Sequence, residues 1–213
     1  TYNFANFRSE ESPKARNADK RTSDRFHANL VKWQGYPLKN PLLKLPPDLD
    51  ALALECFECI LRYSGDMPQD HDFTEVKCVY TVLMVCHKIL ILTIFLFYVF
   101  SQHCHKHLIL RDEVYCQLMK QTTANRSTCS DSSQRAWRLL SILAAYFGCS
   151  EALRPYLVEH LTSAATDRRG TAAVCLTNLR KTARCGGRKN VRYLKLSQYI
   201  IIIKFNLIKG PKR

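Results

Sequence analysis

The sequence lacks the short motifs that mark most nucleotide-binding and hydrolytic sites. It contains no GxxxxGK(S/T) phosphate-binding loop, no GxGxxG motif, no HExxH pair of zinc ligands and no GxSxG nucleophile motif. Each motif supplies backbone amides, metal ligands or a nucleophile that its chemistry requires. Their absence argues against an enzyme, and we predict no catalytic residue and no cofactor for this chain.

Acidic residues are missing from the C-terminal part of the chain. Residues 168–213 hold 13 Lys and Arg and no Asp or Glu, whereas the residues before them hold 19 basic and 18 acidic residues. The net charge of +14 therefore belongs almost entirely to the last 46 residues. Such a segment attracts an acidic partner: an acidic polymer surface, an anionic lipid or a nucleic acid. Charge alone does not choose among these three.

An N-terminal signal peptide and a regular cysteine framework are also missing. The ten cysteines have no repeating spacing, which predicts reduced, mostly buried thiols in a cytoplasmic protein. Cys56 and Cys59 form one CxxC without a second, so we interpret them as core-facing thiols rather than zinc ligands. The histidine-rich residues 103–107 lack zinc-ligand spacing and are interpreted as a polar hinge. We therefore predict no metal site.

Apolar residues are present in helical spacing, and this periodicity predicts an all-α fold built as a single helical bundle. The predicted N-caps are Asp48, Asp131 or a neighbouring serine, and Ser150. The predicted C-terminal stops are Gly65 and the Gly186–Gly187 pair. The inward-facing residues of the two later helices are predicted to be Trp137, Leu140, Leu143, Ala144, Phe147, Leu153, Leu157 and Leu161. Those of the last helix are Ala172, Val174, Cys175, Leu179 and Ala183.

The prolines are concentrated before the first of these helices. The segment PLKNPLLKLPP at residues 37–47 is predicted to run extended across the bundle, since proline disfavours a long helix. Its predicted anchors are Leu38, Leu42, Leu43 and Leu45. Residues 1–29 show no apolar period and are predicted to be a flexible lead-in.

The stretch from Leu110 to Thr123, LRDEVYCQLMKQTT, organises the predicted bundle. Arg111, Asp112 and Glu113 open it, and we interpret them as a capped, salt-bridged first turn because carboxylates are stabilised at a helix N-terminus. The apolar face behind them consists of Leu110, Val114, Tyr115, Cys116, Leu118 and Met119.

This stretch resembles the signature of the myosin tail homology domain of type four, which occurs in tails of unconventional myosins, here a class fifteen-like one. PLKNPLLKLPP, WRLLSILAAYF, LRPYL and GGRKNV extend the resemblance over Trp33–Val191. The residues that carry the family signature, with an expected structural role, are Leu110, Arg111, Asp112, Glu113, Tyr115, Gln117, Gln121 and Trp137.

The resemblance implies a cytoplasmic, cytoskeleton-associated binding module of an actin-based motor complex, without the motor itself. It further implies a FERM domain beside this one in the full-length protein. In the family, basic surfaces engage microtubules and acidic peptides. The matching candidates here are Arg180, Lys181, Arg184, Arg188 and Lys189. A solvated basic face is the alternative interpretation of these residues, and nucleic-acid binding ranks last because no nucleic-acid module is recognisable.

The chain departs from the family between two near-identical heptapeptides. CHKILIL at 86–92 recurs as CHKHLIL at 104–110, so we predict that an apolar insertion at about 87–104 interrupts a domain spanning 30–191. Val79–Phe100 is long enough to span a bilayer, which makes membrane anchoring the alternative function. Lys88 near its centre favours an extra helix or a gene-model error instead. Residues 192–213 form a basic and apolar tail outside the family pattern.

Overall fold

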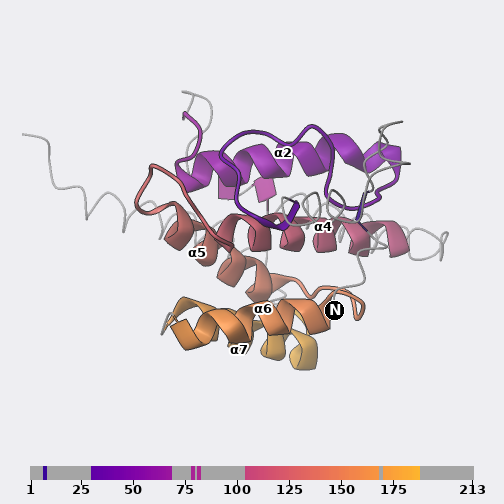
Figure 1. The fold of residues 1–213 in the computed structure, drawn as a ribbon. Helices are drawn as coiled ribbons and strands as arrows, with labels where there is room; N and C mark the ends of the chain where they lie inside the picture. The colour runs from indigo at the N-terminus through magenta and orange to yellow at the C-terminus, as the bar shows by residue number, and fades with distance from the viewer. Residues whose placement is uncertain are drawn as a thin grey trace, which may run out of the picture.

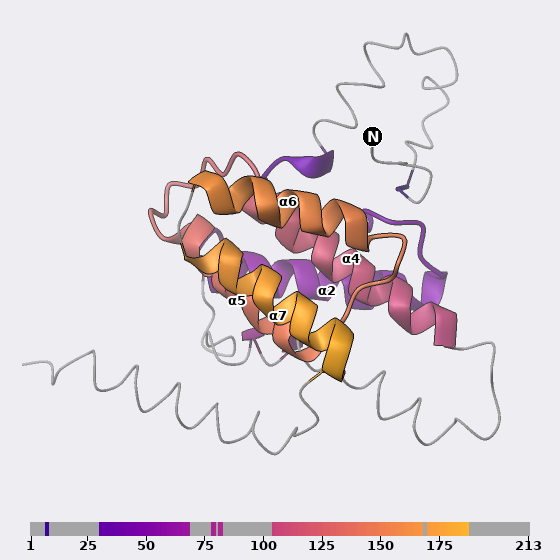
Figure 2. The ribbon, with the colours of Figure 1, turned by 90° about the horizontal axis from the view of Figure 1, so that it is seen from below.

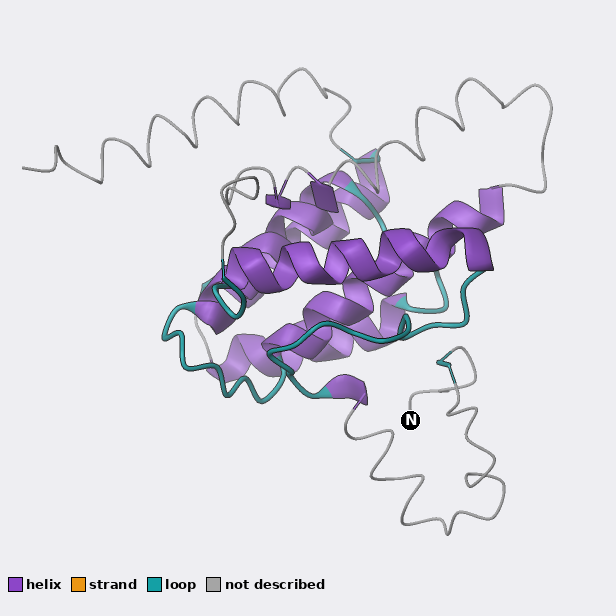
Figure 3. Ribbon diagram, turned by 90° about the horizontal axis from the view of Figure 1, so that it is seen from above, coloured by secondary structure: helices purple, strands orange, loops and turns teal. Residues whose placement is uncertain are grey.

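The computed structural model describes residues 7–8, 30–68, 78–79, 81–82, 104–167 and 170–187. These residues form the helices α2 (Pro47–Ser64), α4 (Cys104–Thr122), α5 (Ser132–Tyr146), α6 (Arg154–Asp167) and α7 (Thr171–Cys185). The β pairing among them is one isolated antiparallel bridge between Phe7 and Leu43. Figure 3 shows the described residues as helices joined by loops, which confirms the predicted all-α fold.

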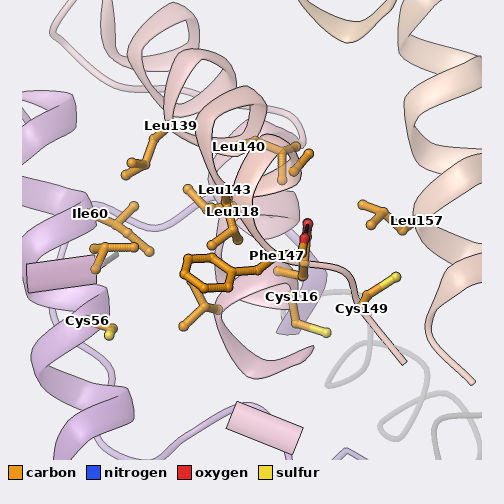
Figure 4. Packing of buried hydrophobic residues seen from close by; sticks show 14 of the residues in the cluster. Cys56, Ile60, Cys116, Leu118, Leu139, Leu140, Leu143, Phe147, Cys149 and Leu157 are labelled. Carbon is orange, nitrogen blue, oxygen red and sulfur yellow. Dashed lines mark hydrogen bonds between the residues drawn. The ribbon is translucent and has the colours of Figure 1, made fainter. Parts of the chain in front are cut away.

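The helices pack as a layered bundle around α4. Helix α4 contacts α2, α5 and α6, while α7 packs on α5 and α6. Figure 1 shows α2 at one edge of the bundle and α6 and α7 at the other, and Figure 2 shows the same arrangement from below. Ile60, Leu118 and Leu143 are fully buried where α2, α4 and α5 meet, and Leu157 of α6 joins this core (Figure 4).

The ends of α2 follow the predicted signals with one shift. Gly65 adopts φ +82°, a left-handed conformation that glycine reaches without strain, and its N–H bonds back to the last turn. Pro46, however, is the N-cap residue, and Asp48 lies inside the first turn. The prediction that Asp48 caps α2 is therefore wrong, although its charge still suits that end of the helix.

The predicted core faces are mostly confirmed, with an exception on α7. Trp137, Leu140 and Leu143 are buried, as are the predicted leucine anchors Leu42, Leu43 and Leu45. Val174 is 49% exposed, and Ala183 is exposed as well. Both core predictions are wrong because the buried stripe of α7 steps through positions 172, 175, 179 and 182. Thr182 fills the last position, and its hydroxyl donates to the carbonyl of Ala144 at 2.7 Å.

The charged triplet is not a helix start. Helix α4 begins at Cys104, so Asp112 and Glu113 lie in its interior, and both are buried. The predicted capped and salt-bridged first turn is therefore wrong, as is the polar hinge from Cys104 onward. Because α4 begins well before Leu110, the positive end of its dipole is too far away to stabilise the carboxylates of Asp112 and Glu113.

Glu113 instead binds the backbone of the proline-rich segment. The N–H groups of Leu42 and Leu43 donate to its two carboxylate oxygens at 2.9 and 2.7 Å, and the amide of Gln117 donates at 2.9 Å. A carboxylate is an acceptor on both oxygens, so one buried side chain satisfies all three donors. This contact fixes the extended segment across α4.

Polar side chains further along the same face of α4 bind other backbone carbonyls. The amide of Gln117 donates to Ala53 of α2 at 2.9 Å, and that of Gln121 donates to Gln34 at 3.1 Å. The ammonium of Lys120 donates to the carbonyls of Leu30 and Lys32 at 3.1 and 2.6 Å. This face therefore holds the segment from residue 30 to α2 in place.

The opposite face of α4 holds the connection between α5 and α6. Asp112 accepts the N–H and the hydroxyl of Ser150 at 2.8 and 2.5 Å, and the Ser150 oxygen accepts the N–H of Leu153 at 3.1 Å. Ser150 thus caps the turn that leads into α6, but α6 itself begins at Arg154, so the predicted start of this helix at Ser150 lies about one turn too early. The hydroxyl of Tyr115 donates to the carbonyl of Phe147 at 2.6 Å, and the Arg111 guanidinium lies 5.5 Å from the Phe147 ring centre.

Most of the apolar segment at residues 79–100 lies outside the described residues, as do nearly all of the lead-in and the tail after residue 191. Within the described part of the chain, none of the helices combines the length and the hydropathy that crossing a bilayer requires. Phe7 and Arg8 of the lead-in contact the bundle, Phe7 through its bridge to Leu43.

Replacing Glu113 by Ala removes the acceptor for three buried donors. Each buried donor left without an acceptor costs about 1–3 kcal/mol, so we expect the free energy of unfolding to fall by at least about 3 kcal/mol. Urea unfolding followed by circular dichroism measures it. Glu58→Ala is the control, since Glu58 is partly exposed and pairs with Arg62 in the same helix at 3.2 Å; it should cost less than about 1 kcal/mol. Equal losses would contradict the anchoring role.

The burial of Glu113 also predicts a pH dependence. Burial raises the pKa of Glu113 from 4.5 to about 7, against the opposing effect of its N–H donors. The folded state therefore binds this proton more tightly than the unfolded chain. The resulting stability is fully present below about pH 4.5 and is lost as the pH rises through about 7, by up to about 3 kcal/mol.

Urea unfolding at pH 5 and pH 8 measures this loss. We expect the stability of Glu113→Gln to change less between the two pH values than that of the wild type, because glutamine does not titrate. An identical pH dependence in the two proteins would show that Glu113 has an ordinary pKa in the folded state.

Candidate partner-binding surface

Helix α7 presents a basic face to solvent. Arg180, Lys181 and Arg184 are exposed, whereas Cys175 and Leu179 are buried on the other side of the helix. The three cations lie in the last two turns of α7, where the negative end of the helix dipole favours positive charge. In the described part of the chain, none of the three forms an ion pair with an Asp or Glu. Their charge is therefore directed at the solvent.

The buried side of α7 fixes this face relative to the bundle. The amide of Asn178 donates to the carbonyl of Ser141 in α5 at 3.1 Å, one turn before the Thr182–Ala144 contact. The thiol of Cys175 lies 3.7 Å from the carbonyl of Trp137. Burial raises the pKa of the Cys175 thiol to about 12, so this contact involves a neutral group. Three successive turns of α7 are thus attached to α5.

The chain leaves α7 along a path that only glycine permits. Gly186 adopts φ +74°, and a Cβ atom on Gly187 would lie 1.8 Å from the carbonyl oxygen of Tyr146 at the end of α5. The two glycines end the helix as predicted. The close approach of Gly187 to Tyr146 was not predicted from the sequence and is seen only in the structure. Arg188 and Lys189, which follow, lie outside the described residues. The structure therefore brings three of the five predicted binding residues together and does not describe the other two.

An exposed apolar residue accompanies the cations. Val174 lies two turns before Lys181 on α7, and it is one of two exposed large hydrophobic residues in the described part of the chain. The sequence prediction placed Val174 in the core and so missed it as a surface residue. The exposed side of α7 thus combines an apolar position near its start with positive charge near its end.

Apart from the half-buried Arg111, the family-signature residues are buried in the bundle. Leu110, Tyr115 and Gln117 are fully buried. Trp137 is buried too and stacks on His160 with ring centres 5.3 Å apart. Burial lowers the pKa of His160, which keeps its ring neutral in this stack.

The CxxC pair is likewise part of the core. Cys56 and Cys59 are buried free thiols of α2. A hydrogen bond with the Cys78 thiol, together with burial, raises the pKa of Cys59. Among the described residues, no three His, Cys, Asp or Glu side chains are grouped to hold a metal ion.

A family model described as the MyTH4 domain matches residues 98–195. The chain is 35% identical over 157 residues to human unconventional myosin-XV, an alignment that covers 71% of this chain and 4% of that protein. It is 31% identical over 175 residues to Drosophila melanogaster myosin-VIIa, covering 78% of this chain and 7% of that protein. The chain therefore spans less than a tenth of the length of these two relatives.

Solved structures agree with the family match. The C-terminal MyTH4-FERM domain of human myosin 7b, in complex with the harmonin-a PDZ3 domain, superposes with a TM-score of 0.63 at 26% identity. The match covers 88% of this chain and 32% of that one. The MyTH4-FERM MF2 domain of Dictyostelium discoideum myosin VII shares the fold, with a TM-score of 0.56 at 23% identity over 76% of this chain.

The family match, the helical fold and the similarity to myosin-XV and myosin-VII lead to one assignment. This chain belongs to the MyTH4 domains of unconventional myosin tails, which are binding modules and not catalytic domains.

Proposed function

We propose that this MyTH4 domain binds an acidic protein surface, such as a microtubule or an acidic peptide, through the basic face of α7. The observation that supports the proposal is the cluster of Arg180, Lys181 and Arg184, exposed on one helix that is attached to the bundle by its other side. Cations without ion-pair partners keep their field directed outward, which accelerates and orients the encounter with an acidic partner.

Arg188 and Lys189 extend this charge along the chain. They follow the two glycines after α7, in a sequence that has no acidic residue from Arg168 onward. We include both in the proposed binding surface, which then carries five cations within ten residues. No Asp or Glu in this part of the sequence competes with an external acidic partner.

We also propose the setting in which the domain works. The myosin 7b structure pairs a MyTH4 domain with a FERM domain and contains a PDZ partner. By analogy, the full-length protein would carry a FERM domain beside residues 30–191 and bind protein cargo at the cytoskeleton in the cytoplasm. Nucleic acid is not among the partners we propose, since the chain resembles no nucleic-acid module.

Charge reversal on α7 tests the proposed surface. We expect Arg180→Glu, Lys181→Glu and Arg184→Glu together to weaken co-sedimentation with stabilised microtubules at least about tenfold, because attraction becomes repulsion. The affinity of the wild type should fall more steeply between 50 and 200 mM salt than that of the variant. A labelled polyglutamate peptide measures the same effect with an acidic peptide.

A matched control removes the same net charge elsewhere. Lys39, Lys44 and Arg138 are exposed and lie outside α7, so the triple Glu variant at these positions should retain most of the binding. If both triple variants lose binding equally, only net charge matters and the α7 site is rejected. Salt-insensitive binding by the wild type would reject it too.

A further inference from the structure

The N-terminal residues Phe7 and Arg8 occupy a defined place on the bundle. Phe7 forms an antiparallel bridge with Leu43, and the N–H of Arg8 donates to the carbonyl of Leu42 at 2.9 Å. The Phe7 side chain is only 6% exposed and belongs to the hydrophobic core cluster. One guanidinium nitrogen of Arg8 lies 3.0 and 2.9 Å from the two carboxylate oxygens of Asp50. The backbone of both residues, the ring of Phe7 and the guanidinium of Arg8 thus all contact the bundle.

The surface that receives Phe7 and Arg8 is held by other parts of the fold. The N–H groups of Leu42 and Leu43 are bound by Glu113 of α4, and Asp50 lies in the first turn of α2. None of these contacts involves Phe7 or Arg8. The edge therefore offers the apolar side chains of Leu42 and Leu43, the carbonyl of Leu42 and the carboxylate of Asp50, all placed by contacts that do not involve residues 7–8.

The attachment of Phe7 and Arg8 to this surface crosses a long stretch of sequence. Residues 9–29, 21 residues in all, separate Arg8 from the start of the described body at residue 30. Because Phe7 and Arg8 belong to the same chain as this surface, their binding to it is intramolecular, which favours them over a separate peptide. Phe7 and Arg8 therefore act as an intramolecular ligand of a surface that is distant from them in the sequence.

We propose that the edge formed by Leu42, Leu43 and Asp50 is a peptide-docking site, filled within the chain by Phe7–Arg8. The site fits an extended peptide in which an arginine directly follows an aromatic residue. The aromatic ring enters the core, the backbone adds to the edge as a strand would, and the arginine pairs with Asp50. An external segment with the same two residues competes with Phe7–Arg8 for the site.

This site is distinct from the basic face of α7. Asp50 belongs to α2, and Figure 1 shows α2 and α7 at opposite edges of the bundle. The two sites also have opposite charge preferences, because Asp48 and Asp50 are acidic whereas α7 is basic. The failure of one proposal would leave the other standing.

A peptide titration tests the docking site. The probe is a fluorescent peptide of residues 1–13, TYNFANFRSEESP, added to the full chain and to its Phe7→Ala/Arg8→Ala variant, in which the site is vacated. We expect saturable binding to the variant below millimolar concentration. Binding to the wild type should be about tenfold weaker, because the tethered segment competes. Fluorescence anisotropy measures both.

Charge exchange identifies the contact with Asp50. In the vacated variant, Asp50→Lys should weaken binding of the probe at least about fivefold and restore binding of a probe carrying Arg8→Glu. Asp48→Lys is the matched control, since Asp48 is exposed two residues away in the same turn. It should change the affinity less than twofold. Equal effects of Asp48→Lys and Asp50→Lys would overturn the assignment.

Circular dichroism verifies that each variant remains helical. If the double variant loses its helical signal, the titration uses Arg8→Glu alone, because Arg8 and Asp50 are partly exposed and tolerate replacement. Absence of probe binding to a folded variant at millimolar concentration overturns the proposal. Equal affinity of the wild type and the vacated variant overturns it as well.

Discussion

The contact on which the bundle depends is the carboxylate of Glu113, buried at the centre and bonded to the N–H groups of Leu42 and Leu43. A charge in an apolar interior is costly unless hydrogen bonds compensate for the lost water. Here the compensation comes from an extended segment whose own donors would otherwise be buried without acceptors. Burying the carboxylate without these donors is costly, and so is burying the two N–H groups without this acceptor, so each requires the other. The extended segment and α4 therefore form as one unit.

Most other polar residues of α4 act in the same way, since they bind backbone groups, although Gln117 also donates to Glu113 and Asp112 also accepts the Ser150 hydroxyl. Gln117, Lys120 and Gln121 donate to carbonyls, and Tyr115 does so on the opposite face. Backbone groups are present whatever side chain a residue carries. The helix can therefore hold a loop in position while the loop's exposed side chains vary. A binding domain gains from this arrangement, because its surface can change without loss of the bundle.

Periodicity predicted most of the fold because it reports which helix face is apolar. It identified the exposed cations of α7 for the same reason, since Arg180, Lys181 and Arg184 lie opposite the buried Leu179. Periodicity gave a wrong prediction at Glu113, because a charged residue within an apolar pattern indicates a position at the surface. The donors that make its burial tolerable are 70 and 71 residues away and are found only in three dimensions. Gly187 is a similar case, because its constraint is a carbonyl on another helix.

The two proposed sites differ in how they connect to the bundle. A ligand at Leu42 and Leu43 binds the extended segment that Glu113 holds. Its binding is therefore coupled to the contact that stabilises the fold. By linkage, such a ligand raises the global stability of the chain. The cations of α7 project from the surface, and a ligand there gains mainly screened electrostatic attraction. Docking at α2 should therefore be coupled to folding, with only its partly exposed Arg8–Asp50 contact weakened by salt, whereas binding at α7 should depend on salt throughout.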